Sequence, residues 1–349
     1  MIKICTLTII LAIAAAISGC KNKSSEKRYE DTGKIDIKYI KTGSIDRYSS
    51  LLDNIISPGE LPEVIAEGFE WAEGPLWLPE QEILLFSDIP QNSVFQWSEK
   101  NGLKLYLKPA GYTGKLPRGG ETGSNGLLLD NEGRLVLCQH GDRRIARMDA
   151  PLDQPEPHFI TLADKWEGKK FNSPNDAVFN ERGDLFFTDP AYGMEYGFED
   201  PAREISFTGV YKLSAEGALT LLTDKMSAPN GIGLSPDGSR LYVANSGLGD
   251  KAIWMVYSIN EDGSLDEGSI FYNASKEQSE DSGNPDGLVV REDGIIFATG
   301  PGGVWILSPD GELLGRVKTG QDTSNCTIGN DGRYLYITAD MYLLRIKLK

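Results

Sequence analysis

Short runs of apolar residues recur along the chain, and each run is bounded by turn-forming residues. In the segment at 173–193, SPNDAVFNERGDLFFTDPAYG, a polar pair precedes a short apolar run, a Gly-containing turn, a second apolar run and another turn. Apolar runs of this length with period two, divided by turn residues, are typical of β-strands. The pattern therefore predicts β-strands throughout this segment.

The same layout occurs six times. In five copies the turn centre lies seven residues after the opening polar residue, and successive openings lie 52, 50, 55, 56 and about 39 residues apart. Spacings of this size leave room for one four-stranded sheet per copy, which is the period range of propeller blades. We therefore predict an all-β fold, a six-bladed β-propeller over residues 61–349. The openings are Glu73, Asn125, Asn175, Asn230, Asp286 and, in the weakest copy, Ser324 or Asn325.

We call these openings the ring residues, because equivalent positions of propeller blades form a ring around the central channel. Two carboxylates, three amides and one small polar group would converge there from distant parts of the sequence. Asn, Asp and Gly also start tight turns, and that explanation would suffice for any single copy. Six copies in one register favour the ring.

The N-terminus has the pattern of an export signal. Residues 1–19 carry a Lys near the front, an apolar run too short to span a membrane, and small residues before Cys20. The sequence Ile17-Ser18-Gly19-Cys20 resembles a bacterial lipobox, in which the Cys is lipidated; the alternative is an ordinary signal peptide that contains a Cys. Residues 20–60 follow as the lipidated Cys and a polar tether, although IDRYSSLLDNII at 45–56 could form a short helix packed on the body.

Composition limits the chemistry. The formal net charge is −16 and the chain has no basic stripe, so nucleic acid is not an expected partner. The two His residues cannot build a His-rich zinc site, and there is no GxSxG, HExxH, zinc-spaced Cys pair or phosphate loop. Cys138 and Cys326 lie in apolar runs of different blades, where free buried thiols are commoner than a disulfide.

Oxygen ligands remain. Carboxylate and amide oxygens suit Ca²⁺ and tolerate Mg²⁺ or Mn²⁺. Glu73 and Asp286 would neutralise a divalent cation, while Asn175 and Asn230 would add neutral ligands. Such a site leaves positions for water and substrate, so the cation could polarise a carbonyl and activate water.

A family resemblance appears in these same segments. The combination of WAEGPLW, SPNDAVF with FTDPAYG, APNGIGLSPDG with LYVANS, and NPDGLVV resembles the SMP-30/gluconolactonase family over about residues 62–349. The resemblance implies six blades, one catalytic divalent cation in the channel and hydrolysis of the ester bond of sugar lactones. It places Glu73, Asn230 and Asp286 on the metal ligands, with Asn175 contacting the metal, its water or the substrate. The similar calcium arrangement of paraoxonase lactonases favours Asn175 as a direct ligand.

Further roles follow from the resemblance. Asp286 is the candidate base, and Asn125, Asn175 and His140 are candidate substrate-binding residues. His140, in CQHGDRRIARM, could bind a sugar hydroxyl or be a structural His. Arg143 and Arg144 are expected to be solvated, and Tyr192 is a weaker pocket candidate. The Gly-rich loop at 111–123 could cover the site or merely connect blades.

The leading hypothesis is thus a lactonase, expected to be a monomer, with one divalent cation (Ca²⁺ first, then Mg²⁺, Mn²⁺ or Zn²⁺) and a small lactone as partner. The membrane is contacted only through a lipid on Cys20, and Lys21 after it favours the outer membrane. The alternative is a non-catalytic propeller that binds a sugar or calcium at the cell envelope. A condensation enzyme of the strictosidine synthase type, which needs no metal, fits poorly.

Overall fold

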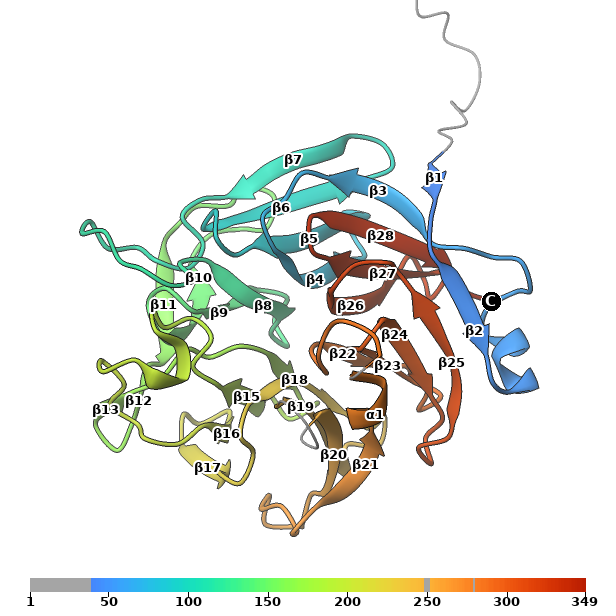
Figure 1. Ribbon diagram of the computed structural model, residues 1–349. Helices are drawn as coiled ribbons and strands as arrows, with labels where there is room; N and C mark the ends of the chain where they lie inside the picture. Colours follow the sequence, from blue (N-terminus) through green and yellow to red (C-terminus); the bar gives the residue numbers. More distant parts are fainter. Residues whose placement is uncertain (1–38, 248–251, 279) are drawn as a thin grey trace, which may run out of the picture. The chain divides into compact units, whose positions relative to one another are not determined.

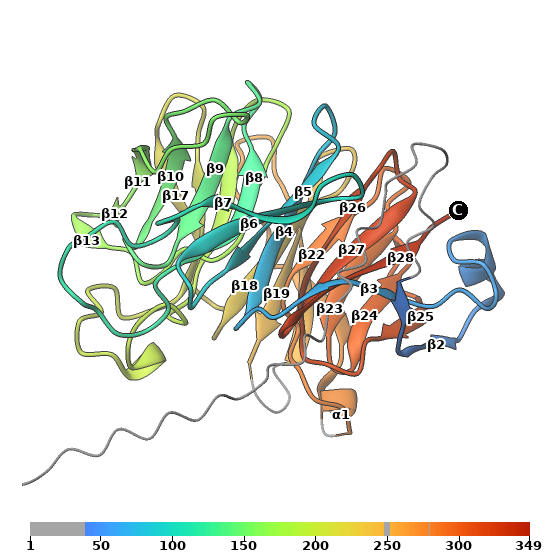
Figure 2. The same cartoon turned by 90° about the horizontal axis from the view of Figure 1, so that it is seen from above.

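The computed structural model describes residues 39–349 except 248–251 and 279. The predicted signal segment, Cys20 and the predicted tether up to residue 38 lie outside the described residues. In the described unit, six antiparallel sheets of four or five strands are arranged around a common centre (Figure 1). Figure 2 shows the same sheets from the side. The prediction of an all-β, six-bladed propeller is confirmed.

Four blades are each formed by four consecutive strands, and the first strand of each lies innermost. Short turns join the first and second strands of each of these blades, as the Gly-containing sequence pattern predicts. From the inside outward the strands are β4 (Ala72–Leu78), β5 (Ile83–Asp88), β6 (Ser93–Ser98) and β7 (Gly102–Leu107) in blade 1; β8 (Ser124–Leu129), β9 (Leu135–Gln139), β10 (Arg144–Met148) and β11 (Phe159–Ala163) in blade 2; β14 (Ala177–Phe179), β15 (Leu185–Asp189), β16 (Gly209–Leu213) and β17 (Leu219–Thr223) in blade 3; and β18 (Pro229–Leu234), β19 (Arg240–Ser246), β20 (Ala252–Ser258) and β21 (Ser269–Asn273) in blade 4.

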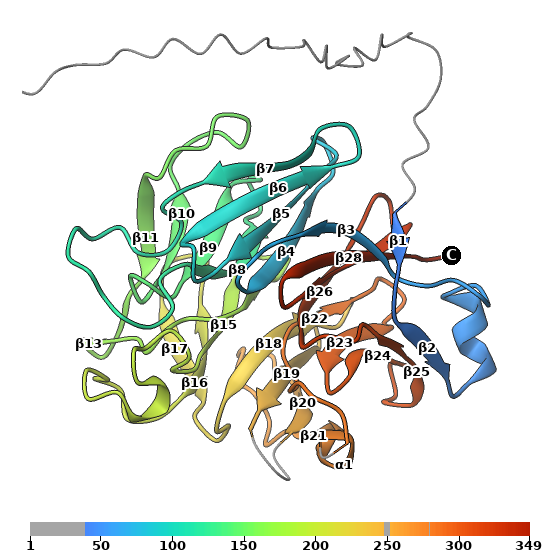
Figure 3. The same cartoon turned by 45° about the horizontal axis from the view of Figure 1, so that its top comes forward.

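The last two blades receive strands from the N-terminal part of the unit. Blade 5 holds β22 (Leu288–Val290), β23 (Ile296–Gly300), β24 (Gly303–Leu307) and β25 (Leu313–Lys318), followed at its outer edge by β2 (Ser44–Arg47). Blade 6 holds β26 (Thr323–Gly329), β27 (Tyr334–Ala339) and β28 (Tyr342–Lys347), followed by β3 (Glu63–Glu67) and β1 (Ile40–Lys41). Figure 3 shows β1 and β2 on the outer side of these blades, near the C terminus. The N-terminal strand β3 therefore closes the propeller.

This closure corrects the boundary predicted at residue 60. Residues 40–60 are not a tether in the structure, because β1 pairs with β3 and β2 pairs with β25. The helix expected within 45–56 exists as the short 3-10 helix η1 (Ser50–Asn54). The propeller unit begins at Tyr39.

The remaining elements lie between blades. They are the two-stranded ribbon of β12 (Lys165–Trp166) and β13 (Lys169–Lys170), the 3-10 helix η2 (Gly197–Glu199) and the short helix α1 (Ser275–Gln278). None of the helices in the described part of the chain has the length and apolar character that a membrane crossing needs.

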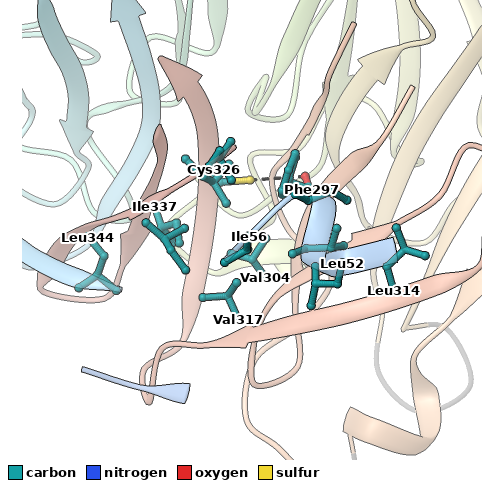
Figure 4. Close-up of a cluster of buried hydrophobic side chains, with 14 of the residues drawn as sticks. Leu52, Ile56, Phe297, Val304, Leu314, Val317, Cys326, Ile337 and Leu344 are labelled. Atoms are coloured by element: carbon teal, nitrogen blue, oxygen red, sulfur yellow. Dashed lines mark hydrogen bonds between the residues drawn. The ribbon is translucent and has the colours of Figure 1, made fainter. Parts of the chain in front are cut away.

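The apolar face of each sheet is buried against the next blade. Between blades 5 and 6, Leu52 and Ile56 of the N-terminal segment insert among Val304, Val317 and Ile337, all fully buried (Figure 4). Burying a Leu or Ile side chain is worth about 1.5–3 kcal/mol, so this segment stabilises the closure as well as covering it.

Cys138 and Cys326 are both buried free thiols, as predicted. The Cys326 thiol donates to the carbonyl of Phe297 at 3.4 Å. These cysteines belong to the core and take no part in cross-linking the blades.

Candidate active site at the ring

The inner strands bring the ring residues together by hydrogen bonds between neighbouring blades. The backbone N–H after a ring residue donates to the carbonyl of the next ring residue: Gly126 to Asn175 at 2.8 Å, Gly231 to Asp286 at 3.1 Å. Gly287 donates in the same way to Ser324 at 2.7 Å. The sixth ring residue is therefore Ser324, and Asn325 lies one position further along the strand.

Close packing explains the glycines of this motif. A Cβ on Gly74 would lie 2.2 Å from the carbonyl oxygen of Asn125, and one on Gly231 would lie 2.2 Å from that of Asp286. Real Cβ atoms do not approach so closely, so only glycine permits the inner strands to meet here. Hydroxyls of the second strands add support, since Ser87 donates to the Asn125 carbonyl at 2.9 Å and Thr188 to that of Asn230 at 2.8 Å.

Most ring side chains are buried, and several are incompletely hydrogen-bonded. Glu73, Asn125, Asn175 and Asn230 are each at most 5% exposed. Buried oxygens without a hydrogen-bond partner are found on Asn125 (Oδ1), Asn175 (Oδ1) and Asp286 (Oδ1). Such atoms cost about 1–3 kcal/mol each when left unpaired. Three such oxygens at one ring indicate that the ring binds a cation or a group that donates hydrogen bonds.

Electrostatics point to the same kind of ligand. Burial, reinforced by the charge of Asp176, raises the pKa of Glu73 to about 8, against hydrogen bonds from Gly74 and Asn325 that lower it. Burial, together with the charges of Glu73 and Asp176, raises the pKa of Asp286 well above its usual range. Carboxylates crowded in this way repel one another unless a positive charge lies between them.

The donor set fits an oxygen-loving cation. Among the residues that the structure describes, no three His, Cys, Asp or Glu side chains are grouped so that they could hold a metal by themselves. A cation at the ring would need amide oxygens besides the carboxylates, and Asn175 offers an unpaired one. The amide of Asn230 donates to Ser246 Oγ at 3.1 Å and also hydrogen-bonds Asp286.

A second polar layer lies beneath the ring. Asp176 occupies the position that is Gly in four other copies, and its Oδ1 accepts from the N–H of Ala177 at 2.9 Å. Burial raises the pKa of Asp176 to about 7 despite hydrogen bonds that include one from Asn325. Asp176 and Asn325 both line a cavity of about 210 Å³. The sequence signal that could have identified Asp176 as a site residue is that an Asp replaces the Gly of four other copies.

The rim of the ring is formed by residues from loops. Tyr192 is half-buried, and its hydroxyl hydrogen-bonds Ser246, which in turn contacts Asn230. His140 is fully buried; its Nδ1 lies 2.7 Å from Glu121 Oε2, and its Nε2 has no hydrogen-bond partner. Sequence reasoning missed Glu121, because it lies between two copies of the repeat and carries no motif.

The two arginines after His140 do not reach the ring. Arg143 donates from Nε to the carbonyl of Phe171 at 2.6 Å, and Arg144 donates to Gln139 and Asp142 at 2.6 and 2.9 Å. They are only partly exposed and hold neighbouring loops, so the expected solvated role is wrong. A larger cavity of about 640 Å³ is lined by turns of blades 3 and 4 and contains no ring residue.

Comparisons with known proteins agree with this geometry. Residues 71–340 match the family described as SMP-30/Gluconolactonase/LRE-like region. The chain is 38% identical over 313 residues to the gluconolactonase of Zymomonas mobilis, covering 88% of this chain and 86% of that protein. A gluconolactonase structure from Xanthomonas campestris has a TM-score of 0.75 at 27% identity, covering 89% of this chain and 98% of that one. Regucalcin from Agrobacterium tumefaciens, a calcium-binding protein, has a TM-score of 0.63 at 18% identity, covering 82% and 94%, and shows the fold alone.

Proposed function

Because the chain belongs to the SMP-30/gluconolactonase family, we propose that it hydrolyses the ester bond of a sugar lactone at the ring, with one divalent cation. The observation that carries this proposal is the set of buried, unpaired oxygens on Asn125, Asn175 and Asp286 beside the carboxylate of Glu73. The similarity to the Zymomonas mobilis gluconolactonase supports the substrate class.

The cation would be held by Glu73, Asn175, Asn230 and Asp286. Calcium is our first choice because the donors are all oxygens, and magnesium, manganese or zinc are the alternatives. When bound, the cation would act as a Lewis acid that polarises the carbonyl of an ester.

The protein's own residues orient the substrate and move the proton. Asp286 Oδ1, buried and unpaired, accepts a proton from the water that attacks the ester carbonyl. When the C–O bond of the lactone breaks, this proton passes to the leaving oxygen, which becomes a hydroxyl of the opened product. Asn125 and Asn175 present amides to the substrate, and His140 acts at the rim through its contact with Glu121. The burial of the ring excludes bulk water and strengthens each of these contacts.

A non-catalytic propeller that binds a sugar or calcium is the second candidate, because the same ring could bind without reacting. A panel of lactones, assayed with chelator-treated protein and with each metal added back, separates the two. We expect ring opening that disappears on chelation and returns with one cation. Tight calcium or sugar binding without hydrolysis of any lactone would favour the binding propeller.

We also propose that the protein acts as a monomer attached to the outer membrane through a lipid on Cys20. The proposal is supported by the lipobox-like sequence, which lies outside the described residues. Lipid labelling should be lost in Cys20→Ala and retained in Cys5→Ala, because Cys5 lies in the predicted signal segment at 1–19. A Cys20→Ala protein that remains fully labelled would contradict the anchor.

A further inference from the structure

The loop at 111–123 is fastened over the ends of blades 2 and 3. The guanidinium of Arg118 donates to the carbonyls of His140 at 3.2 Å and Gly193 at 2.6 Å, and also to that of Gly141. Thr113 donates from Oγ1 to Asp142 at 2.6 Å. Several backbone carbonyls therefore fix the loop, and it is more than a connector.

The loop places a carboxylate at the rim. Glu121 precedes the ring residue Asn125 by four positions, and His140 directly follows Gln139, which pairs with Ser124. The charge of Glu121 also contributes to raising the pKa of Tyr192 and of Asp286, after larger contributions. Glu121 therefore lies near the opening of the ring.

His140 holds the carboxylate of Glu121 in place. A carboxylate only accepts hydrogen bonds, so the 2.7 Å contact requires a hydrogen on Nδ1 of His140. The His140 side chain is fully buried, whereas that of Glu121 is 36% exposed. His140 is packed closely, since a Cβ on Gly193 would lie 2.7 Å from its Cβ. The buried imidazole of His140 thus fixes the partly exposed carboxylate of Glu121, which solutes can reach.

We propose that Glu121 determines specificity for lactones that carry hydroxyl groups, and that His140 is its positioning residue. The inference rests on the proposed function and deepens it. A fixed carboxylate accepts hydrogen bonds from ring hydroxyls and has nothing to offer an unsubstituted lactone. Because His140 fills one side of the carboxylate, the other oxygen is left for the substrate.

The test compares glucono-δ-lactone with δ-valerolactone, which has the same ring and no hydroxyl groups. Glu121→Ala should lower the ratio of their kcat/KM values about 10- to 100-fold, the usual effect of losing a hydrogen bond to a charged group. The loss should come from glucono-δ-lactone alone. Glu121→Gln keeps an oxygen acceptor and should keep a larger part of the ratio.

Glu195→Ala is the matched control. Glu195 is an exposed carboxylate beside the same loop, since a Cβ on Gly119 would lie 2.4 Å from its Cδ. The carboxylate that pairs with His140 is that of Glu121. This variant should leave the ratio unchanged. A fall equal to that of Glu121→Ala would mean that rim charge in general is responsible and would overturn the proposal.

The role of His140 is tested in combination. Adding His140→Asn to Glu121→Ala should lower the ratio no further, because His140 acts through Glu121; a further fall would overturn its positioning role. If wild type opens both lactones and Glu121→Ala keeps the wild-type ratio, the inference fails alone. If wild type opens neither lactone, the proposed function fails with it.

Discussion

The amide nitrogen of Asn325 donates a hydrogen bond to Glu73 Oε2 at 3.2 Å, from the last blade to the first. The other end of the amide is fixed, since Asn325 Oδ1 accepts from the N–H of Cys326 at 2.8 Å. Gly287 makes room for it, because a Cβ there would lie 2.0 Å from Asn325 Cγ. Asn325 thus orients a proposed cation ligand without belonging to the ring.

We predict that Asn325→Leu, which keeps the volume and removes the donor, weakens cation affinity about 10- to 100-fold, as is typical for residues that orient metal ligands. Ser324→Ala is the control, because Ser324 bonds Ala72 and Thr338 and no hydrogen bond joins it to Glu73. Calorimetric titration of calcium into chelated protein measures the cation affinity of both variants and of wild type. Equal affinity in Asn325→Leu and wild type would contradict the positioning role.

A second prediction separates base from ligand. Asp286→Asn keeps an oxygen and loses the base, so kcat should fall about 10²- to 10⁴-fold even at saturating cation. Glu73→Gln removes one charge, so its activity should largely return as cation is raised. Plateau rates are compared with occupancy measured directly. Near-wild-type kcat for Asp286→Asn at full occupancy would show that the base lies elsewhere, with Asp176 the next candidate.

The third prediction concerns pH. Burial raises the pKa of Glu73 to about 8 and those of Asp176 and Asp189 to about 7, from the ordinary values of 4.5 for Glu and 3.8 for Asp. Between roughly pH 4 and 8 the folded, chelated protein therefore binds more protons than the unfolded chain, and its stability falls as pH rises. Exposed carboxylates such as Asp237, whose pKa is lowered to about 2, titrate below this window.

Thermal unfolding checks this sign. The Tm of chelated protein should fall between pH 5 and pH 8, and saturating calcium should raise Tm more at pH 8 than at pH 5, because the cation favours the charged carboxylates. A chelated protein whose Tm rises steadily over this range would contradict the assignment of the buried acids.

The repeat made the blades and the ring predictable, because each inner strand keeps the same distance from opening residue to turn. Glu73, Asn125, Asn175, Asn230 and Asp286 all take the predicted positions in the fold. Their roles as ligands, base and substrate contacts stay predictions. The choice between Ser324 and Asn325 required the hydrogen bond from Gly287, which no sequence pattern reveals.

Contacts between distant segments were not predictable. β3 pairs with β28 although nearly the whole chain separates them, and the repeat contains no sign of this exchange. The segment at 40–60 seemed polar enough for a tether, yet Leu52, Ile55 and Ile56 are buried. Glu121 reaches the ring through a loop between copies, where no periodicity applies.

The fourth prediction concerns closure. Arg345 on β28 donates to Glu63 Oε2 of β3 at 3.1 Å and to Glu99 of blade 1, and its guanidinium lies 4.8 Å from the ring centre of Tyr39. The Arg345 side chain is only 8% exposed. Arg345→Met would remove its charge and leave the carboxylate of Glu63 without its partner. The side chains of Glu63 and Glu99 are 23% and 54% exposed, so the charges left behind stay partly solvated. We expect a loss of about 1–3 kcal/mol in the free energy of unfolding.

Urea unfolding measures this loss. Arg333→Met is the matched control, since Arg333 is 61% exposed and bonds only its own turn; it should change stability by about 0.5 kcal/mol or less. Equal effects of the two substitutions would show that Arg345 does not secure the closure.

The most direct test of the account is the rate of gluconolactone ring opening against the number of cations bound per chain. Chelated wild-type protein, shown by direct measurement to be free of metal, is titrated with calcium. Ring opening is monitored through the acid that it releases. We predict no catalysis without cation and a linear rise of the rate that ends at one cation per chain. Full activity in protein shown to be free of metal would contradict it.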